Sequence, residues 1–198
     1  MPITTLLLDA DGVVQTNAGL IERVATLLGD RATFWEASAV EQRAITGHVD
    51  LRRALADFLD ERRIDLDPDV LLDAWCYTEP DPDAFALVDA VRAQGVRVFL
   101  ATNQQPVRGR WMRASLGYER HFDDLFFSHE LGLAKPDRAY FLAILERVGA
   151  TGDGTLFIDD MAPNVAGARD AGLLAEWHDR TTGAAGIARI LDAHGVRH

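Results

Sequence analysis

The chain begins with a short apolar run, Leu6-Leu7-Leu8, that stops abruptly at Asp9. Similar runs recur later, and the segments between them carry apolar residues at helical spacing. Short apolar runs are typical of strands buried on both faces, and their alternation with helices is typical of a parallel sheet with crossover helices. The predicted strands cover residues 3–9, 96–101, 124–128, 155–159 and 173–177, and the predicted helices cover 84–94, 108–116, 137–149, 163–171 and 184–194.

The alternation is interrupted between residues 16 and 82. Turn-forming residues there separate segments that all have helical periodicity, and no strand pattern is visible. The predicted helices are 21–28, 31–45, 51–63 and 68–77. We therefore expect an α/β core made of residues 1–15 and 83–198, with an all-helical insertion at 16–82 that follows the first strand.

Polar side chains follow the predicted strands at their carboxyl ends. Alternate residues of a strand share a face, so Asp9 and Asp11 are expected to project together. Two carboxylates this close repel unless a cation or a shared proton compensates, which indicates a metal site or an acid–base pair, although an Asx-type turn has the same residues. Parallel strands place their carboxyl ends on one rim. The residues expected there are Asp9, Asp11, Thr102, Asn103, Lys135, Asp159 and Asp160.

Composition narrows the possible partners. Of 198 residues, 48% are hydrophobic and 26% are charged, as in globular proteins, and the net charge of −11 argues against nucleic acid. No apolar run is long enough to span a membrane, and the first residues lack the pattern of a signal peptide. Cys76 is the only cysteine, so intramolecular disulfides are impossible and a cytoplasmic location is expected.

Lysine usage gives a further clue. Of the 20 basic Lys and Arg residues, only Lys135 is a lysine. A compact ammonium group is therefore retained at a predicted rim position in a chain that otherwise uses arginine. We interpret Lys135 as a functional residue.

Four segments together resemble the motifs of the haloacid dehalogenase-like (HAD) hydrolases. The first is the strand that ends in Asp9-Ala10-Asp11-Gly12-Val13, and the second is the strand that ends in Thr102. The third contains Lys135-Pro136, and the fourth contains Asp159-Asp160 followed by Asn164. The resemblance implies a Rossmann-like α/β core and identifies the insertion as a small helical cap. Within the family, the chain is most similar to the sugar-phosphatase branch and to the branch of the epoxide-hydrolase N-terminal phosphatase domains.

The resemblance also implies roles for these residues. Asp9 would be the nucleophile, Asp11 the general acid and base, and Lys135 a third catalytic residue that also binds the substrate with Thr102 and Asn103. A Mg²⁺ cofactor would be held by Asp9, Asp11 and Asp160, with Asp159 close to it. Asn164 would orient Asp160 or Lys135.

The resulting hypothesis is a Mg²⁺-dependent phosphatase that hydrolyses a small phosphomonoester, such as a sugar phosphate, through an aspartyl-phosphate. The alternatives are a phosphomutase, a 2-haloacid dehalogenase and a non-catalytic phosphate-binding protein. The expected partner is the small phosphorylated substrate, with no nucleic acid or membrane, and the chain is expected to be a monomer or a homodimer. Substrate choice would depend on the cap, where the residues that could face the cleft are Trp35, Arg43, His48, Arg52, Trp75 and Tyr77.

Overall fold

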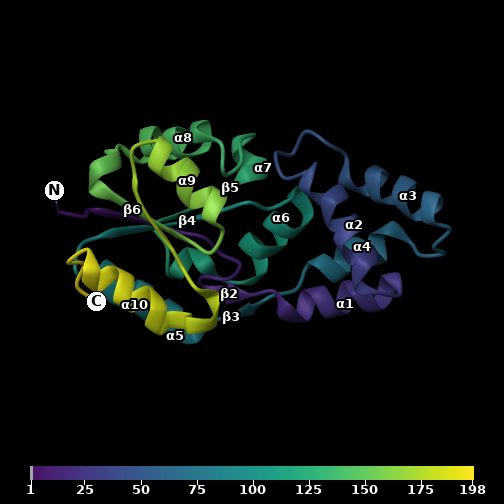
Figure 1. Cartoon of the computed structure of the whole chain (residues 1–198), viewed down its shortest axis with the longest axis horizontal. Coiled ribbons are helices and arrows are strands. Elements are labelled where there is room, and N and C mark those ends of the chain that lie inside the picture. Colours follow the sequence, from purple (N-terminus) through teal and green to yellow (C-terminus); the bar gives the residue numbers. More distant parts are fainter. Residues whose placement is uncertain (1) are drawn as a thin grey trace.

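A computed structural model describes residues 2–198. Figure 1 shows two parts side by side, an α/β core and a smaller group of helices joined to it by two chain segments. Among the described residues, no helix combines the length and apolar character needed to cross a membrane.

The core is built on a five-stranded parallel sheet with the strand order β5-β4-β1-β6-β7. Strand β1 lies at its centre, where Leu8 pairs with Leu100 on one side and with Ile158 on the other. All four residues of β1 are buried, because helices cover both faces of the sheet. All five predicted strands are confirmed, as β1 (Thr5–Leu8), β4 (Arg97–Thr102), β5 (Asp124–Phe127), β6 (Thr155–Asp159) and β7 (Leu174–Trp177).

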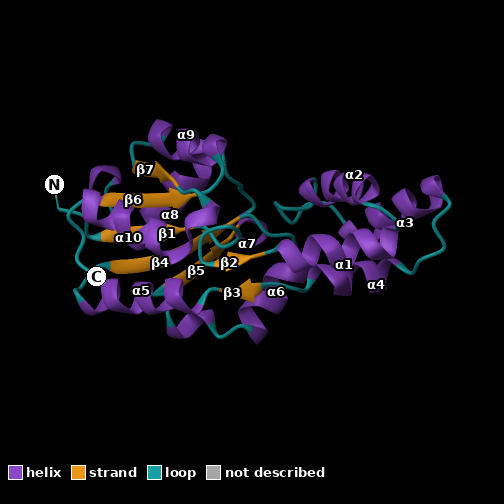
Figure 2. Ribbon diagram, turned by 60° about the horizontal axis from the view of Figure 1, so that its bottom comes forward, coloured by secondary structure: helices purple, strands orange, loops and turns teal. Residues whose placement is uncertain are grey.

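Two helical layers cover the sheet (Figure 2). Leu6 and Leu8 pack on one face with helices α5 and α10, whereas Leu7 packs on the other with α8 and α9, as alternation along a strand requires. The five predicted core helices are confirmed as α5 (Pro82–Ala93), α6 (Pro106–Ser115), α8 (Arg138–Val148), α9 (Ala162–Asp170) and α10 (Gly183–Ala193). Short elements complete the core: α7 (Ser128–Leu131), η1 (Tyr118–Arg120), η2 (Gly152–Gly154) and η3 (Arg180–Thr182).

Side-chain caps explain where several core helices begin. The Asp81 carboxylate accepts hydrogen bonds from the backbone at the start of α5, and Asp137 does the same for α8. Helix α8 ends at Gly149, whose φ of 62° lies in the left-handed region that favours glycine. The helix ends therefore follow from residues that are local in the sequence.

The helical insertion has a hydrophobic core of its own. Buried residues from all four helices form it, including Val24, Phe34, Leu55 and Leu71. The helices are α1 (Ala18–Leu28), α2 (Arg31–Gln42), α3 (Leu51–Arg62) and α4 (Pro68–Trp75). This observation supports a helical cap, and we propose 16–82 as its extent.

Helix α2 is shorter than the prediction that extended it to residue 45. After Gln42 the backbone continues in tighter turns, with Ala44 N–H bonded to the Glu41 carbonyl and Gly47 N–H to the Ala44 carbonyl. At the end of the helix, hydrogen bonds between residues three positions apart thus replace the α-helical bonds between residues four positions apart. The apolar spacing alone does not reveal this change.

The two chain segments between core and cap pair with each other. Strand β2 (Gln15–Thr16) runs antiparallel to β3 (Glu79–Pro80), with Thr16 opposite Glu79. The sequence places the boundaries of the insertion here and predicts no strand. The pairing joins residues more than 60 positions apart, so a local pattern does not contain it.

Candidate active site

The predicted residues meet at the carboxyl-terminal rim of the sheet. Asp9 and Asp11 follow β1, Thr102 ends β4, and Asp159 ends β6. Because the strands are parallel, these ends share one edge of the sheet, where ligands bind in open α/β folds. The cap lies over this edge (Figure 1).

Lys135 lies between two carboxylates. Its Nζ is 2.7 Å from Asp9 Oδ1 and 2.6 Å from Asp159 Oδ2, and the residue is only 3% exposed. Burial alone lowers the pKa of Lys135, but the charges of Asp159 and Asp9 outweigh burial and raise it. The lysine is therefore a fixed positive charge at the centre of the site.

For Asp9, in contrast to Lys135, burial outweighs the charge of the ion-pair partner. Burial is the main cause that raises its pKa, and the Asp159 charge adds to it, whereas Lys135 opposes both; the resulting pKa is about 7. Carboxylate oxygens of Asp9, Asp159 and Asp160 all lie within 4.8 Å of one another. Hard oxygen ligands crowded in this way fit a divalent cation such as Mg²⁺, which would offset the repulsion between the carboxylates.

Asp159 is the most enclosed of the three acids. It is fully buried and accepts hydrogen bonds from Lys135 Nζ, from the Met161 backbone N–H at 2.8 Å and from Asn164 Nδ2 at 3.0 and 3.1 Å. The predicted contact of Asn164 with Asp160 or Lys135 is therefore replaced by one with Asp159. Asn164 orients Lys135 only through that carboxylate.

Asp160 lies closer to solvent and has a cationic partner of its own. Its carboxylate forms an ion pair with Arg180 of η3, while its backbone carbonyl accepts a hydrogen bond from Trp177 Nε1 at 2.8 Å. The Asp160 carboxylate also lies against Gly12, whose φ is 85° and where any added Cβ would overlap Asp160 Oδ2. Glycine at this position leaves room for Asp160 beside the first motif.

Asp11 is held by an arginine that the sequence analysis missed. Arg108 of α6 donates from Nη1 to Asp11 Oδ2 at 2.5 Å and from Nη2 to Asp11 Oδ1 at 2.8 Å. Gln15 and Gln104 donate to the same carboxylate at 2.7 and 3.1 Å. Burial raises the pKa of Asp11, but Arg108 and these hydrogen bonds outweigh it and lower it to about 2.

Thr102 and Asn103 lie in the site in different ways. Thr102 is buried, and its hydroxyl accepts a hydrogen bond from Gln104 Nε2 at 3.1 Å. The Asn103 side chain exchanges two hydrogen bonds with the Lys135 backbone, from Nδ2 to the carbonyl at 2.8 Å and from the Lys135 N–H to Oδ1 at 2.9 Å. Asn103 thus also positions the lysine.

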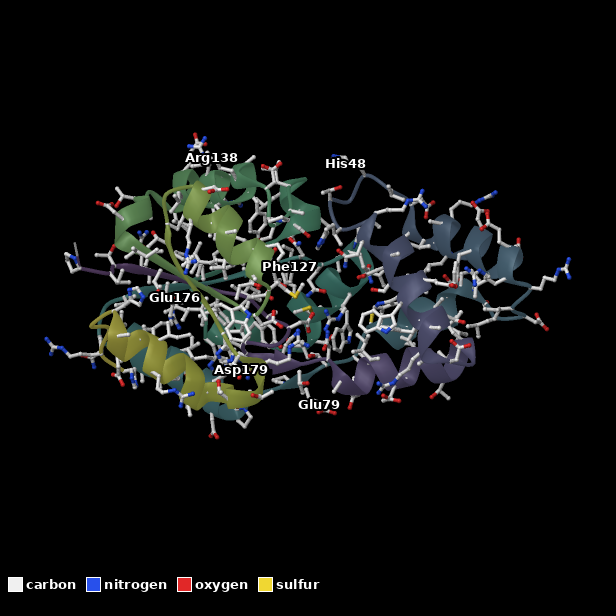
Figure 3. The ribbon with its side chains drawn as sticks, viewed as in Figure 1. His48, Glu79, Phe127, Arg138, Glu176 and Asp179 are labelled. Carbon is white, nitrogen blue, oxygen red and sulfur yellow. The ribbon has the colours of Figure 1, made fainter. Side chains whose placement is uncertain are left out.

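A cleft of about 540 Å³ separates the rim from the cap. Trp35 and Trp75 line it, as the sequence allowed, and so do Asp9, Asp11 and Lys135 from the core. The other proposed cap residues, Arg43, His48, Arg52 and Tyr77, are not among its lining residues. Figure 3 shows His48 on the loop at the edge of the cap, where its Nδ1 lies 3.2 Å from Thr46 Oγ1.

One cap residue in the cleft is a buried carboxylate. Glu41 of α2 is 8% exposed, and its one side-chain hydrogen bond is a long one, from Gln42 Nε2 at 3.4 Å. Burial raises the pKa of Glu41 to about 7, with Arg108 opposing this shift and Asp11 adding to it. Within residues 2–198 no cationic side chain forms an ion pair with Glu41, so the cleft contains an acid without a close cationic partner in this part of the chain.

Sequence reasoning missed four residues that shape this site: Arg108, Gln104, Arg180 and Glu41. The available signal was that Gln104 follows Thr102 by two residues and that Arg108 begins the helix predicted at 108–116, so both lie near the carboxyl end of the same strand. Glu41 and Arg180 carry no such signal, because only the folding of the cap and of the carboxyl-terminal segment brings them to the cleft.

The chain belongs to the haloacid dehalogenase-like hydrolases, because the model of that family matches residues 3–172. The motif resemblance seen in the sequence is thereby confirmed.

Relatives with curated names include phosphatases. Phosphatase MT3486 of Mycobacterium tuberculosis is 33% identical over 129 residues, covering 64% of this chain and 59% of the relative. The phosphoglycolate phosphatase of Rhodospirillum rubrum is 33% identical over 106 residues, covering 54% of this chain and 42% of the relative. The chain thus spans about half the length of these relatives.

Solved structures agree on the fold. The HAD family enzyme bt-2542 of Bacteroides thetaiotaomicron superposes with a TM-score of 0.76 at 20% identity, covering 91% of this chain and 95% of that one. The L-2-haloacid dehalogenase of Xanthobacter autotrophicus superposes with a TM-score of 0.71 at 22% identity, covering 96% of this chain and 83% of the dehalogenase chain. At these identities the likeness concerns the fold alone.

Proposed function

We propose that this chain is a Mg²⁺-dependent phosphatase that hydrolyses a small phosphomonoester through an aspartyl-phosphate intermediate, a sugar phosphate being one candidate substrate. The observation that carries the proposal is Lys135 Nζ, 2.7 Å from Asp9 and 2.6 Å from Asp159, beside carboxylates whose oxygens lie within 4.8 Å of one another. The phosphatases among the relatives support the same reaction class.

Each group of the reaction has a candidate residue. The Asp9 carboxylate would attack phosphorus, and Lys135 would favour the ionised form of Asp9 and stabilise negative charge on the transferring group. The Thr102 hydroxyl would donate to a phosphoryl oxygen, with Asn103 beside it. Asp9, the Asp11 main-chain carbonyl and Asp160 would hold Mg²⁺, with Asp159 near it; when bound, the ion neutralises charge on the phosphoryl oxygens.

Asp11 would protonate the leaving oxygen and then take a proton from the attacking water. The Arg108 pair holds Asp11 ionised, so the conformation described here suits the second of these steps. We infer that Asp11 separates from Arg108 before it acts as an acid.

The decisive experiment is phosphate release from a panel of small phosphomonoesters and p-nitrophenyl phosphate, with and without Mg²⁺. The proposal predicts Mg²⁺-dependent release that Asp9→Asn abolishes, because an amide is not a competent nucleophile. A panel on which the wild-type protein releases no more phosphate than Asp9→Asn contradicts it. Release of chloride from chloroacetate in the presence of a chelator would instead favour dehalogenation.

Location and assembly remain part of the same proposal. The single cysteine, Cys76, fits a reducing compartment, so we propose a cytoplasmic enzyme acting on a small soluble substrate. A monomer or a homodimer is proposed as its assembly.

A further inference from the structure

Glu41 is a buried carboxylate that forms no ion pair with any other residue that the structure describes. It is 92% shielded from solvent, since its exposed fraction is 8%, and it lines the cleft that contains Asp9 and Asp11. The charge of Arg108 acts on Glu41, but both terminal nitrogens of Arg108 donate to Asp11. A buried carboxylate in this situation favours a ligand that brings a hydrogen-bond donor.

The charge of the whole site points in the same direction. Five carboxylates, Asp9, Asp11, Glu41, Asp159 and Asp160, stand against three cations, Arg108, Lys135 and Arg180. A bound divalent cation would balance this excess, and the phosphoryl group would then add negative charge again. A leaving group that also carried a carboxylate would meet repulsion from Glu41.

The walls around Glu41 are mixed in character. Apolar side chains of the cap, including Phe34 and Trp75, border the same cleft, together with the polar Ser38 and Gln42. Such a pocket fits a compact leaving group with apolar faces and one polar group that is directed toward α2.

On the basis of the proposed phosphatase activity, we propose that Glu41 is a specificity-determining residue that accepts a hydrogen bond from a hydroxyl or ammonium group of the leaving group and disfavours anionic leaving groups. The substrate class is thus a phosphomonoester of an amino or polyhydroxy alcohol, rather than of a hydroxy acid.

The test compares three esters of similar size that differ in one terminal group: 2-aminoethyl phosphate, 2-hydroxyethyl phosphate and phosphoglycolate. The first two carry a donor and the third carries a carboxylate. For the wild-type protein we expect kcat/KM to be at least about tenfold higher for one of the two esters with a hydrogen-bond donor than for phosphoglycolate; we call this quotient the donor preference ratio. Comparison of the two donor esters shows whether Glu41 prefers an ammonium or a hydroxyl group.

Glu41→Gln keeps the shape of the side chain and removes its charge, so it should lower the donor preference ratio, kcat/KM for the donor ester divided by kcat/KM for phosphoglycolate, by about tenfold or more. Glu41→Asp keeps the charge and should retain the preference for donors. Glu61→Gln is the matched control, because Glu61 is an exposed carboxylate of the same cap on helix α3; its ratio should stay within about twofold of the wild type.

p-Nitrophenyl phosphate distinguishes the possible failures. If this ester is hydrolysed with Mg²⁺ but the wild type shows no preference for donors, or Glu41→Gln leaves the ratio unchanged, the role of Glu41 is wrong while the phosphatase proposal stands. If the wild type does not hydrolyse even this ester, the phosphatase proposal fails, and the role of Glu41 fails with it.

Discussion

At the scale of single residues, the proposed acid role of Asp11 requires a protonated carboxyl group, whereas its surroundings favour the ionised form. Its proposed first task is to give a proton to the leaving oxygen, yet Arg108 and two glutamine side chains hold it as an anion with a pKa of about 2. The arginine contacts Asp11 and also donates to the Tyr77 carbonyl of the insertion at 3.4 Å. The charge state of Asp11 is thereby linked to the placement of the cap.

The first prediction concerns the need for this proton. Asp11→Asn should lower kcat/KM for alkyl phosphates by about 10²–10⁴-fold, because kcat/KM reports the step in which the leaving oxygen departs and an alkoxide leaves poorly without a proton. The loss should be much smaller for p-nitrophenyl phosphate, whose phenolate leaves readily unprotonated. Steady-state kinetics on both ester types provide the measurement, and equal losses on the two would argue against an acid role.

The second prediction uses the unusual pKa of Glu41. Its folded-state value of about 7 lies above its ordinary value of 4.5, so the folded protein binds the proton more tightly than the unfolded chain does. By linkage, this residue's contribution to stability falls as the pH rises from about 4.5 to 7. Glu41→Gln should therefore gain on the order of 2–3 kcal/mol relative to wild type at pH 8 compared with pH 4.5.

Denaturant unfolding of both proteins at the two pH values measures this difference. Glu61→Gln, on an exposed carboxylate of the same cap, should show no such pH-dependent gain. A Glu41→Gln difference that is the same at both pH values would show that Glu41 titrates normally in the folded protein.

At the scale of elements, the rim is held by helices that approach it closely. Helix α9 carries Asn164 on the side that reaches Asp159, and Gly167 of the same helix lies against the Pro136 carbonyl. A Cβ at residue 167 would overlap that backbone oxygen. The close approach of α9 therefore keeps the Lys135–Pro136 turn and the Asp159 carboxylate in register.

The third prediction tests this packing. Gly167→Ala should push α9 away from Pro136, lowering stability by about 1–3 kcal/mol as overpacking does, and lowering kcat because Lys135 shifts. Asp170→Ala, on an exposed position of the same helix, should change neither quantity substantially. Thermal unfolding and phosphate release together check it; a Gly167→Ala protein of normal stability and activity would show that the helix has room to move.

At the scale of the whole molecule, two hydrophobic units are joined by few contacts. The insertion has its own buried cluster, and it meets the core through the β2–β3 pair and through contacts such as Ser128 Oγ with the Ile45 carbonyl at 2.5 Å. The acidic site lies on the core side of this junction. Cation binding is therefore expected to stabilise the core directly.

The fourth prediction follows from that location. Saturating Mg²⁺ should raise Tm by about 5 °C or more, because a ligand that binds only the folded state stabilises it by mass action. Asp160→Asn should remove most of this increase. Asp153→Asn should retain it, because Asp153 is exposed and lies before the amino end of β6, at the end of the strand opposite to the rim. A Tm that is insensitive to Mg²⁺ would contradict a resident cation at this site.

The sequence by itself determined the five strands, most helix ends and the acids at the rim. These features depend on local causes: apolar runs, capping residues such as Asp137, and the rule that parallel strands end on one edge. Lys135 was evident for the same reason, since it follows a recognisable strand and turn.

Only the tertiary structure decided which charges pair. Arg108 reaches Asp11 across 97 positions of sequence, and the β2–β3 pair and the burial of Glu41 likewise depend on how the insertion folds back over the core. The chemistry of a carboxylate depends on its neighbours and on its access to water, and for these residues the neighbours come from distant parts of the chain. That is why the sequence located the acids at the rim, whereas the fold determined their protonation.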